Sequence, residues 1–122
     1  MSRTVLEPGP QHPITVEPTS GRVTARAGNT LIAETTDALA LAEAGYPAVY
    51  YIPLADVRSE VLRPSDHTTY CPYKGDATYY SVVTPEGELT DVVWTYVTPY
   101  PAVAPIAGRV AFYANRVDVT VG

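Results

Sequence analysis

Alternation of apolar and polar residues is the dominant pattern in this chain, and it predicts β-strands over most of its length. Residues 14–17 and 21–26 alternate in this way, and Gly28-Asn29 is typical of a tight turn into a third alternating run at 30–34. These three runs predict an opening β-meander. Further β-rich runs follow at residues 49–52, 78–83, 91–97, 109–113 and 117–121.

The two middle runs are separated by turn residues. Pro85-Glu86-Gly87-Glu88 has turn chemistry, so residues 78–83 and 91–97 are expected to form a hairpin. Side chains alternate across a strand, which places Val92, Trp94 and Tyr96 on one face. That face suits a core position for the only tryptophan of the chain.

Helical signals are short. Thr36 and Asp37 precede the run 38–44, and Gly45 follows it, so a capping hydroxyl, an acid in the first turn and a terminal glycine predict a helix. Pro53 is expected to begin a turn or one helical turn through residue 58, and residues 100–108 hold two prolines and at most a short helix. The predicted class is mainly β with one or two short helices.

Domain organisation follows from length and from the start of the chain. A chain of 122 residues fits one domain. Residues 1–13 contain three prolines and no apolar period, which predicts a flexible N-terminal arm. Residues 14–122 are expected to form a single β-rich domain.

Charge and composition exclude several partners. The net charge is -5 and the basic residues are scattered, which argues against nucleic acid and anionic membranes as partners. No apolar run approaches the ~20 residues that span a bilayer, and the N-terminus lacks an apolar signal core, so a cytoplasmic location is expected. Frequent Arg, Ala, Val and Pro indicate a bacterial source. Cys71 is the only cysteine, which leaves no internal disulfide and no cysteine-rich zinc site.

Residues 65–80 are the chemically densest segment of the chain. A thiolate at Cys71 could act as nucleophile or thiol donor, with His67 as general base and Lys74 stabilising developing negative charge. Each residue also has a structural interpretation: a buried inert Cys71, a His67 that fixes its loop through hydrogen bonds, and a solvated turn lysine at Lys74. Gly75 is expected to occupy a turn position with positive φ.

Tyrosines are abundant in and around this segment. A cleft lined with tyrosines favours a planar or amphipathic small molecule, although core packing also explains such residues. Tyr79 and Tyr80 are adjacent on a strand and should face opposite sides of the sheet. The candidate ligand-binding residues are Tyr51, Tyr70, Tyr79, Tyr80 and Trp94. There is no phosphate loop, serine elbow, metalloprotease helix or cysteine pair, so no cofactor or metal is predicted.

The same segment resembles a known bacterial family. His67-Thr68-Thr69-Tyr70-Cys71-Pro72-Tyr73-Lys74-Gly75, together with Gly45-Tyr46-Pro47 and Trp94-Thr95-Tyr96, is similar to the domain of unknown function four hundred and twenty-seven, over residues 12–118. The resemblance implies a β-tent-like fold of two antiparallel sheets. Some relatives look like two fused copies, which suggests that single copies pair as homodimers. Some carry a nucleotidyltransferase-like label, but no paired-aspartate motif supports that activity here.

Two hypotheses for function remain open. The first is a small-molecule pocket, enzymatic or only binding, at the segment 65–80, with His67, Cys71, Lys74 and Tyr79 or Tyr80 converging on it. The second is a module without chemistry, such as a dimer with a tyrosine-rich interface. The partner of the first would be an unidentified small molecule, and that of the second a further copy of the chain.

Overall fold

The computed structural model describes residues 3–122, which form ten strands and three 3-10 helices. The strands are β1 (Ile14–Pro18), β2 (Val23–Ala27), β3 (Thr30–Thr35), β4 (Leu39–Glu43), β5 (Val49–Pro53), β6 (Leu62–Cys71), β7 (Gly75–Thr84), β8 (Gly87–Thr95), β9 (Arg109–Phe112) and β10 (Asp118–Val121). The helices are η1 (Leu54–Asp56), η2 (Ser59–Val61) and η3 (Pro101–Ile106).

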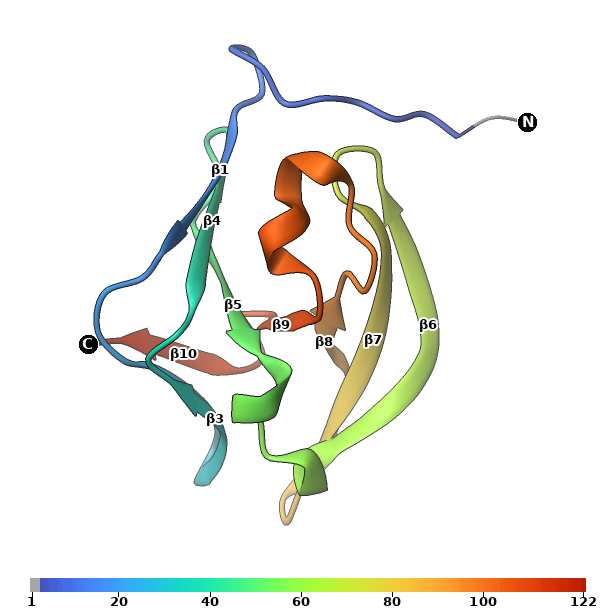
Figure 1. Ribbon diagram of the computed structural model, residues 1–122. Helices are drawn as coiled ribbons and strands as arrows, with labels where there is room; N and C mark the ends of the chain where they lie inside the picture. Colours follow the sequence, from blue (N-terminus) through green and yellow to red (C-terminus); the bar gives the residue numbers. More distant parts are fainter. Residues whose placement is uncertain (1–2) are drawn as a thin grey trace.

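These strands make two antiparallel sheets (Figure 1). The large sheet has the order β1-β4-β5-β9-β8-β7-β6, and the small sheet has the order β10-β2-β3. The predicted class, mainly β with two antiparallel sheets and short helices, is confirmed. The predicted hairpin is present as β7 and β8, and the helical turn expected after Pro53 is η1.

The predicted opening meander is wrong in one respect. β2 and β3 do form a hairpin around Gly28-Asn29, but β1 pairs with β4 in the large sheet. The link from β1 to β2 contains Gly21 at φ +88, and it takes the chain from one sheet to the other. Alternation identifies a strand but carries no information on its partner, so the meander was inferred from sequence order alone.

The predicted helix at residues 36–45 is wrong, because this segment contains strand β4. Leu39 and Leu41 alternate with two alanines, and Leu41 is buried against the large-sheet core. β4 lies between β1 and β5, where its backbone hydrogen bonds are made on both sides. Alanine-rich sequence favours a helix by only tenths of a kcal/mol per residue, so sheet pairing on two edges outweighs it.

Two apolar cores lie on opposite faces of the large sheet. On β5 and β9, Ile52 and Val110 belong to the core shared with the small sheet, whereas Tyr51 and Ala111 belong to the core beneath η3. Figure 1 shows η3 lying between the β4 and β5 side of the large sheet and the β6 and β7 side. The strands at the centre of this sheet therefore carry apolar residues on both faces.

The face predicted for Val92, Trp94 and Tyr96 is only partly correct. Trp94 and Tyr96 pack on the η3 side, but Val92 packs in the core between the sheets. Asp91, at φ +54, lies where the register between β7 and β8 shifts, and the neighbours Val92 and Val93 both pack in the core between the sheets, so alternation is interrupted between these two residues.

Candidate functional site

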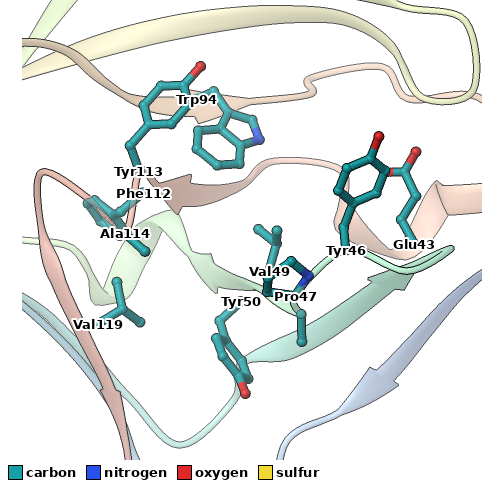
Figure 2. A pocket seen from close by; sticks show the side chains of 11 residues that line it. Glu43, Tyr46, Pro47, Val49, Tyr50, Trp94, Phe112, Tyr113, Ala114 and Val119 are labelled. Atoms are coloured by element: carbon teal, nitrogen blue, oxygen red, sulfur yellow. The ribbon is translucent and has the colours of Figure 1, made fainter.

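A cavity of the described chain has a volume of about 590 Å³ and is predominantly apolar. Figure 2 shows Trp94 and Tyr113 on one side of it and Pro47, Val49 and Tyr50 across from them. The lining residues come from β4, β5, β8, β9, β10 and the adjoining loops; they are Glu43, Tyr46, Pro47, Ala48, Val49, Tyr50, Trp94, Phe112, Tyr113, Ala114 and Val119.

Separation of β5 from β9 accounts for the position of this cavity. The two strands pair only at Ile52 with Val110 and at Pro53 with Arg109. β5 remains paired with β4 back to Val49, and β9 remains paired with β8 out to Phe112. The facing edges of β5 and β9 therefore diverge from the Ile52–Val110 pair toward Val49 on β5 and Phe112 on β9. The cavity lies between these diverging edges.

Aromatic side chains form the wall on the β8 and β9 side. The rings of Trp94 and Tyr113 have centroids 4.7 Å apart at an interplanar angle of 49°. The indole Nε1 of Trp94 donates to the hydroxyl of Tyr51 at 3.2 Å, which fixes the orientation of the indole. Because Tyr51 holds the indole in place, the Trp94 and Tyr113 rings form a rigid surface on which another ring or an apolar group can pack.

Hydroxyl groups continue from this wall toward the β6 strand. The Tyr113 hydroxyl lies 3.4 Å from that of Tyr79, which lies 2.9 Å from Thr69 Oγ1. The hydrogen bond with Tyr79, together with burial, raises the pKa of Tyr113 to about 12. Tyr113 is therefore a neutral phenol at physiological pH, able to donate or accept a hydrogen bond at the cavity.

Glu43 is the one charged residue among residues 3–122 that lines the cavity. Its Oε1 accepts a hydrogen bond from Lys74 Nζ at 2.5 Å, and its Oε2 lies 2.7 Å from His12 Nε2. The ring of His12 stacks on that of Tyr73, with centroids 4.1 Å apart. Burial raises the pKa of Glu43, but the hydrogen bonds and charges of Lys74 and His12 outweigh it, so the net pKa lies below its ordinary value.

The three predicted catalytic residues have separate surroundings. His67 lies over the ring of Tyr79, with centroids 4.5 Å apart, and Lys74 is paired with Glu43. Cys71 is partly buried and packs against the core beneath η3. Lys74 is not a solvated turn residue, since its side chain is only 12% exposed. Lys74 therefore contacts the cavity-lining residue Glu43. His67 contacts Tyr79, which lies behind the lining residue Tyr113.

The predicted ligand-binding residues divide into three groups. Trp94 lines the cavity, while Tyr51 and Tyr79 lie behind it and hydrogen-bond to Trp94 and Tyr113. Tyr80 packs against the core between the sheets. Tyr70 lies elsewhere: its hydroxyl bonds to that of Tyr100 and to the carbonyl of Thr4 in the N-terminal segment.

Of the eleven residues that line the cavity, only Trp94 is among the candidates named from the sequence, and the other ten include Glu43, Tyr46, Tyr50 and Tyr113. Glu43 was assigned to the predicted helix, where its neighbours are different from those in β4. Tyr46 is 70% exposed in the loop after β4. The clustering of tyrosines near residues 46–51 was the available signal, but it did not show that Tyr113 meets them.

Within residues 3–122, no helix is long and apolar enough to cross a membrane.

Comparison with known proteins places the chain in a family. A search of curated proteins finds no match. A family model described as Domain of unknown function (DUF427) matches residues 15–122, close to the range expected from the sequence. The chain therefore belongs to the DUF427 family.

Proposed function

We propose that this protein binds a small, largely apolar molecule with a planar part, in the cavity between the diverging ends of β5 and β9. The observation that carries the proposal is the cavity itself: about 590 Å³, lined by Trp94 and three tyrosines, with Glu43 as its charged residue. Small-molecule sites are typically concave and mostly apolar, with a few polar groups that orient the ligand.

The aromatic wall is preorganised for such a ligand. Trp94 is oriented by Tyr51, and Tyr113 is positioned by Tyr79, so neither ring must be ordered when a molecule enters. Preorganised side chains lower the entropy cost of binding. The roles of His67, Cys71 and Lys74 in this proposal are indirect: Lys74 holds Glu43, His67 supports Tyr79, and Cys71 packs behind the wall.

Trp94 makes the proposal directly testable, because the only tryptophan lines the cavity. We expect the neutral aromatic dye N-phenyl-1-naphthylamine to bind and to quench Trp94 fluorescence by energy transfer. The variant Ala48→Phe adds bulk to the cavity lining and should weaken dye binding by about tenfold or more, since the added ring occupies the ligand volume.

The matched control is Ala104→Phe, an identical change at an exposed position on η3 outside the cavity. This variant should bind the dye like the wild type. Absence of quenching in the wild type, or equal binding by both phenylalanine variants and the wild type, would contradict the proposal.

A further inference from the structure

The cavity lining has a one-sided electrostatic character. Five aromatic side chains, Tyr46, Tyr50, Trp94, Phe112 and Tyr113, contribute to it, and Glu43 contributes a carboxylate. No lysine or arginine is among the lining residues of the described chain. Aromatic faces carry the negative part of the ring quadrupole and favour positive charge, and the Glu43 carboxylate, although paired with Lys74, adds acceptor oxygens to the lining.

Glu43 keeps its charge and retains capacity for another donor. Lys74 and His12 hold it in the ionised form, and each occupies a different carboxylate oxygen. An ionised carboxylate offers about four acceptor positions, so two contacts leave room for a third. Lys74 and His12 are not themselves among the cavity-lining residues, so it is the carboxylate that a ligand meets.

The arrangement of the rings suits a compact cation. The Trp94 and Tyr113 rings both line the cavity and contact each other, tilted by 49° with centroids 4.7 Å apart, so two aromatic rings lie close together in its wall. Cation–π attraction acts within about 6 Å of a ring centroid. Tyr46, 70% exposed, adds a further ring on the Glu43 side of the cavity, as Figure 2 shows.

We propose that the ligand of this cavity is an organic cation, an alkylated ammonium group on an apolar or aromatic body, held by the aromatic rings and the Glu43 carboxylate. This inference rests on the proposed function, and it adds the charge of the ligand. The chain's net charge of -5 acts in the same direction, since a negative protein attracts cations during encounter.

A pair of ligands of equal shape separates the two proposals. Phenyltrimethylammonium carries a positive nitrogen where tert-butylbenzene has a neutral carbon, and each is titrated while Trp94 fluorescence is recorded. The cation should bind about tenfold or more tightly than its neutral isostere. Equal affinities would overturn the cation inference and leave the cavity proposal standing. No binding of either compound would overturn both.

Variants test which residues cause the preference for the cation over its neutral isostere. Glu43→Gln should weaken phenyltrimethylammonium binding by about tenfold and tert-butylbenzene binding by much less. Tyr46→Leu keeps apolar area at an exposed position but removes a ring, and should weaken cation binding a few-fold; it also provides the test if Glu43→Gln does not fold. Glu17→Gln removes one carboxylate at an exposed position outside the cavity and should have no effect. An equal loss in Glu17→Gln and Glu43→Gln would overturn the inference.

Discussion

Glu43 is held by two residues that each lie 31 positions away in the sequence, His12 before it and Lys74 after it. The exposed fractions of the Glu43 and Lys74 side chains are only 17% and 12%. Ion pairs at the surface contribute little to stability, but removal of one partner from a buried pair leaves the other charge without compensation. This pair is therefore expected to matter for folding as well as for the cavity.

Replacement of Glu43 by Gln should lower the free energy of unfolding by roughly 2 kcal/mol at neutral pH, because Lys74 then lacks a counter-charge. This loss is somewhat smaller than that expected for a fully buried pair. Urea denaturation of both proteins measures the difference. The matched variant Glu17→Gln, at an exposed position on β1, should change the free energy of unfolding by less than about 0.5 kcal/mol. Similar losses in both variants would contradict the assignment.

The same residue predicts a pH dependence. The pKa of Glu43 lies below its ordinary value of 4.5 in the folded protein, so the folded state favours the ionised form. Its stabilising contribution is fully present above that ordinary value and is lost as the pH falls through the lower folded-state pKa. The difference in stability between wild type and Glu43→Gln should therefore shrink on acidification below pH 4.5. A constant difference down to acid pH would contradict this.

At the scale of single residues, the sequence identified candidate functional side chains but not the residues that they contact. Lys74 is a candidate from the sequence, yet its contact with Glu43 could not be predicted, because Glu43 was assigned to a helix. His12 lies in the segment predicted to be a flexible arm, where no pattern indicated a contact with β4. Such pairs join distant parts of the chain, and local periodicity holds no information on them.

At the scale of single elements, the turn between β6 and β7 follows directly from local chemistry. Gly75 adopts φ +111, as predicted from its place in the turn, and a Cβ there would lie 3.6 Å from the carbonyl oxygen of Thr98. The carbonyl of Lys74 accepts a hydrogen bond from the Tyr100 backbone, which ties the turn to the start of η3. The position thus requires glycine for its conformation rather than for space.

Gly75→Ala should lower the free energy of unfolding by about 1–3 kcal/mol, since alanine is strained at this positive φ. Thermal or urea denaturation measures the loss. Gly45→Ala is the matched control, because Gly45 does not adopt positive φ and a Cβ there meets no atom within 4 Å. That variant should be neutral or slightly stabilised. A neutral Gly75→Ala would show that the turn changes conformation in solution.

Elements with clear alternation and turn residues were predicted well, as β2, β3, β5 and the β7–β8 hairpin show. β4 was not, because its alanines, its preceding hydroxyl and its following glycine are equally typical of a short helix. Two neighbouring strands decide the outcome by pairing with both of its edges. Neighbours of this kind are set by the tertiary structure and outweigh local propensity.

At the scale of the whole molecule, the large sheet joins two cores. Ile32 on β3 is fully buried in the core between the sheets, and Ile106 in η3 is fully buried in the core on the other face. Adjacent residues of β5 and β9 point into the two cores alternately, so neither core can be lost without disturbing the strands of the other. A single cooperative unit is the expected consequence.

Ile32→Ala and Ile106→Ala should each lower the free energy of unfolding by about 2–5 kcal/mol through lost burial and a new cavity. Both variants should still unfold in one transition, with the same midpoint by Trp94 fluorescence and by far-ultraviolet circular dichroism. As a control, Val97→Ala, at a position 61% exposed, should change stability by less than about 0.5 kcal/mol. Separate midpoints for the two signals would show that the cores unfold independently.

The sequence by itself determined the mainly β class, the positions of most strands, the turns at Gly28-Asn29 and Gly75, and the family. These features depend on side-chain alternation and on local backbone preferences, which are present in short segments. Only the tertiary structure decided that β1 joins β4, that residues 39–43 form a strand, and that β5 and β9 diverge. The cavity lies at that divergence, and Glu43, Trp94 and Tyr113 meet there through pairings between distant strands, which local patterns do not encode.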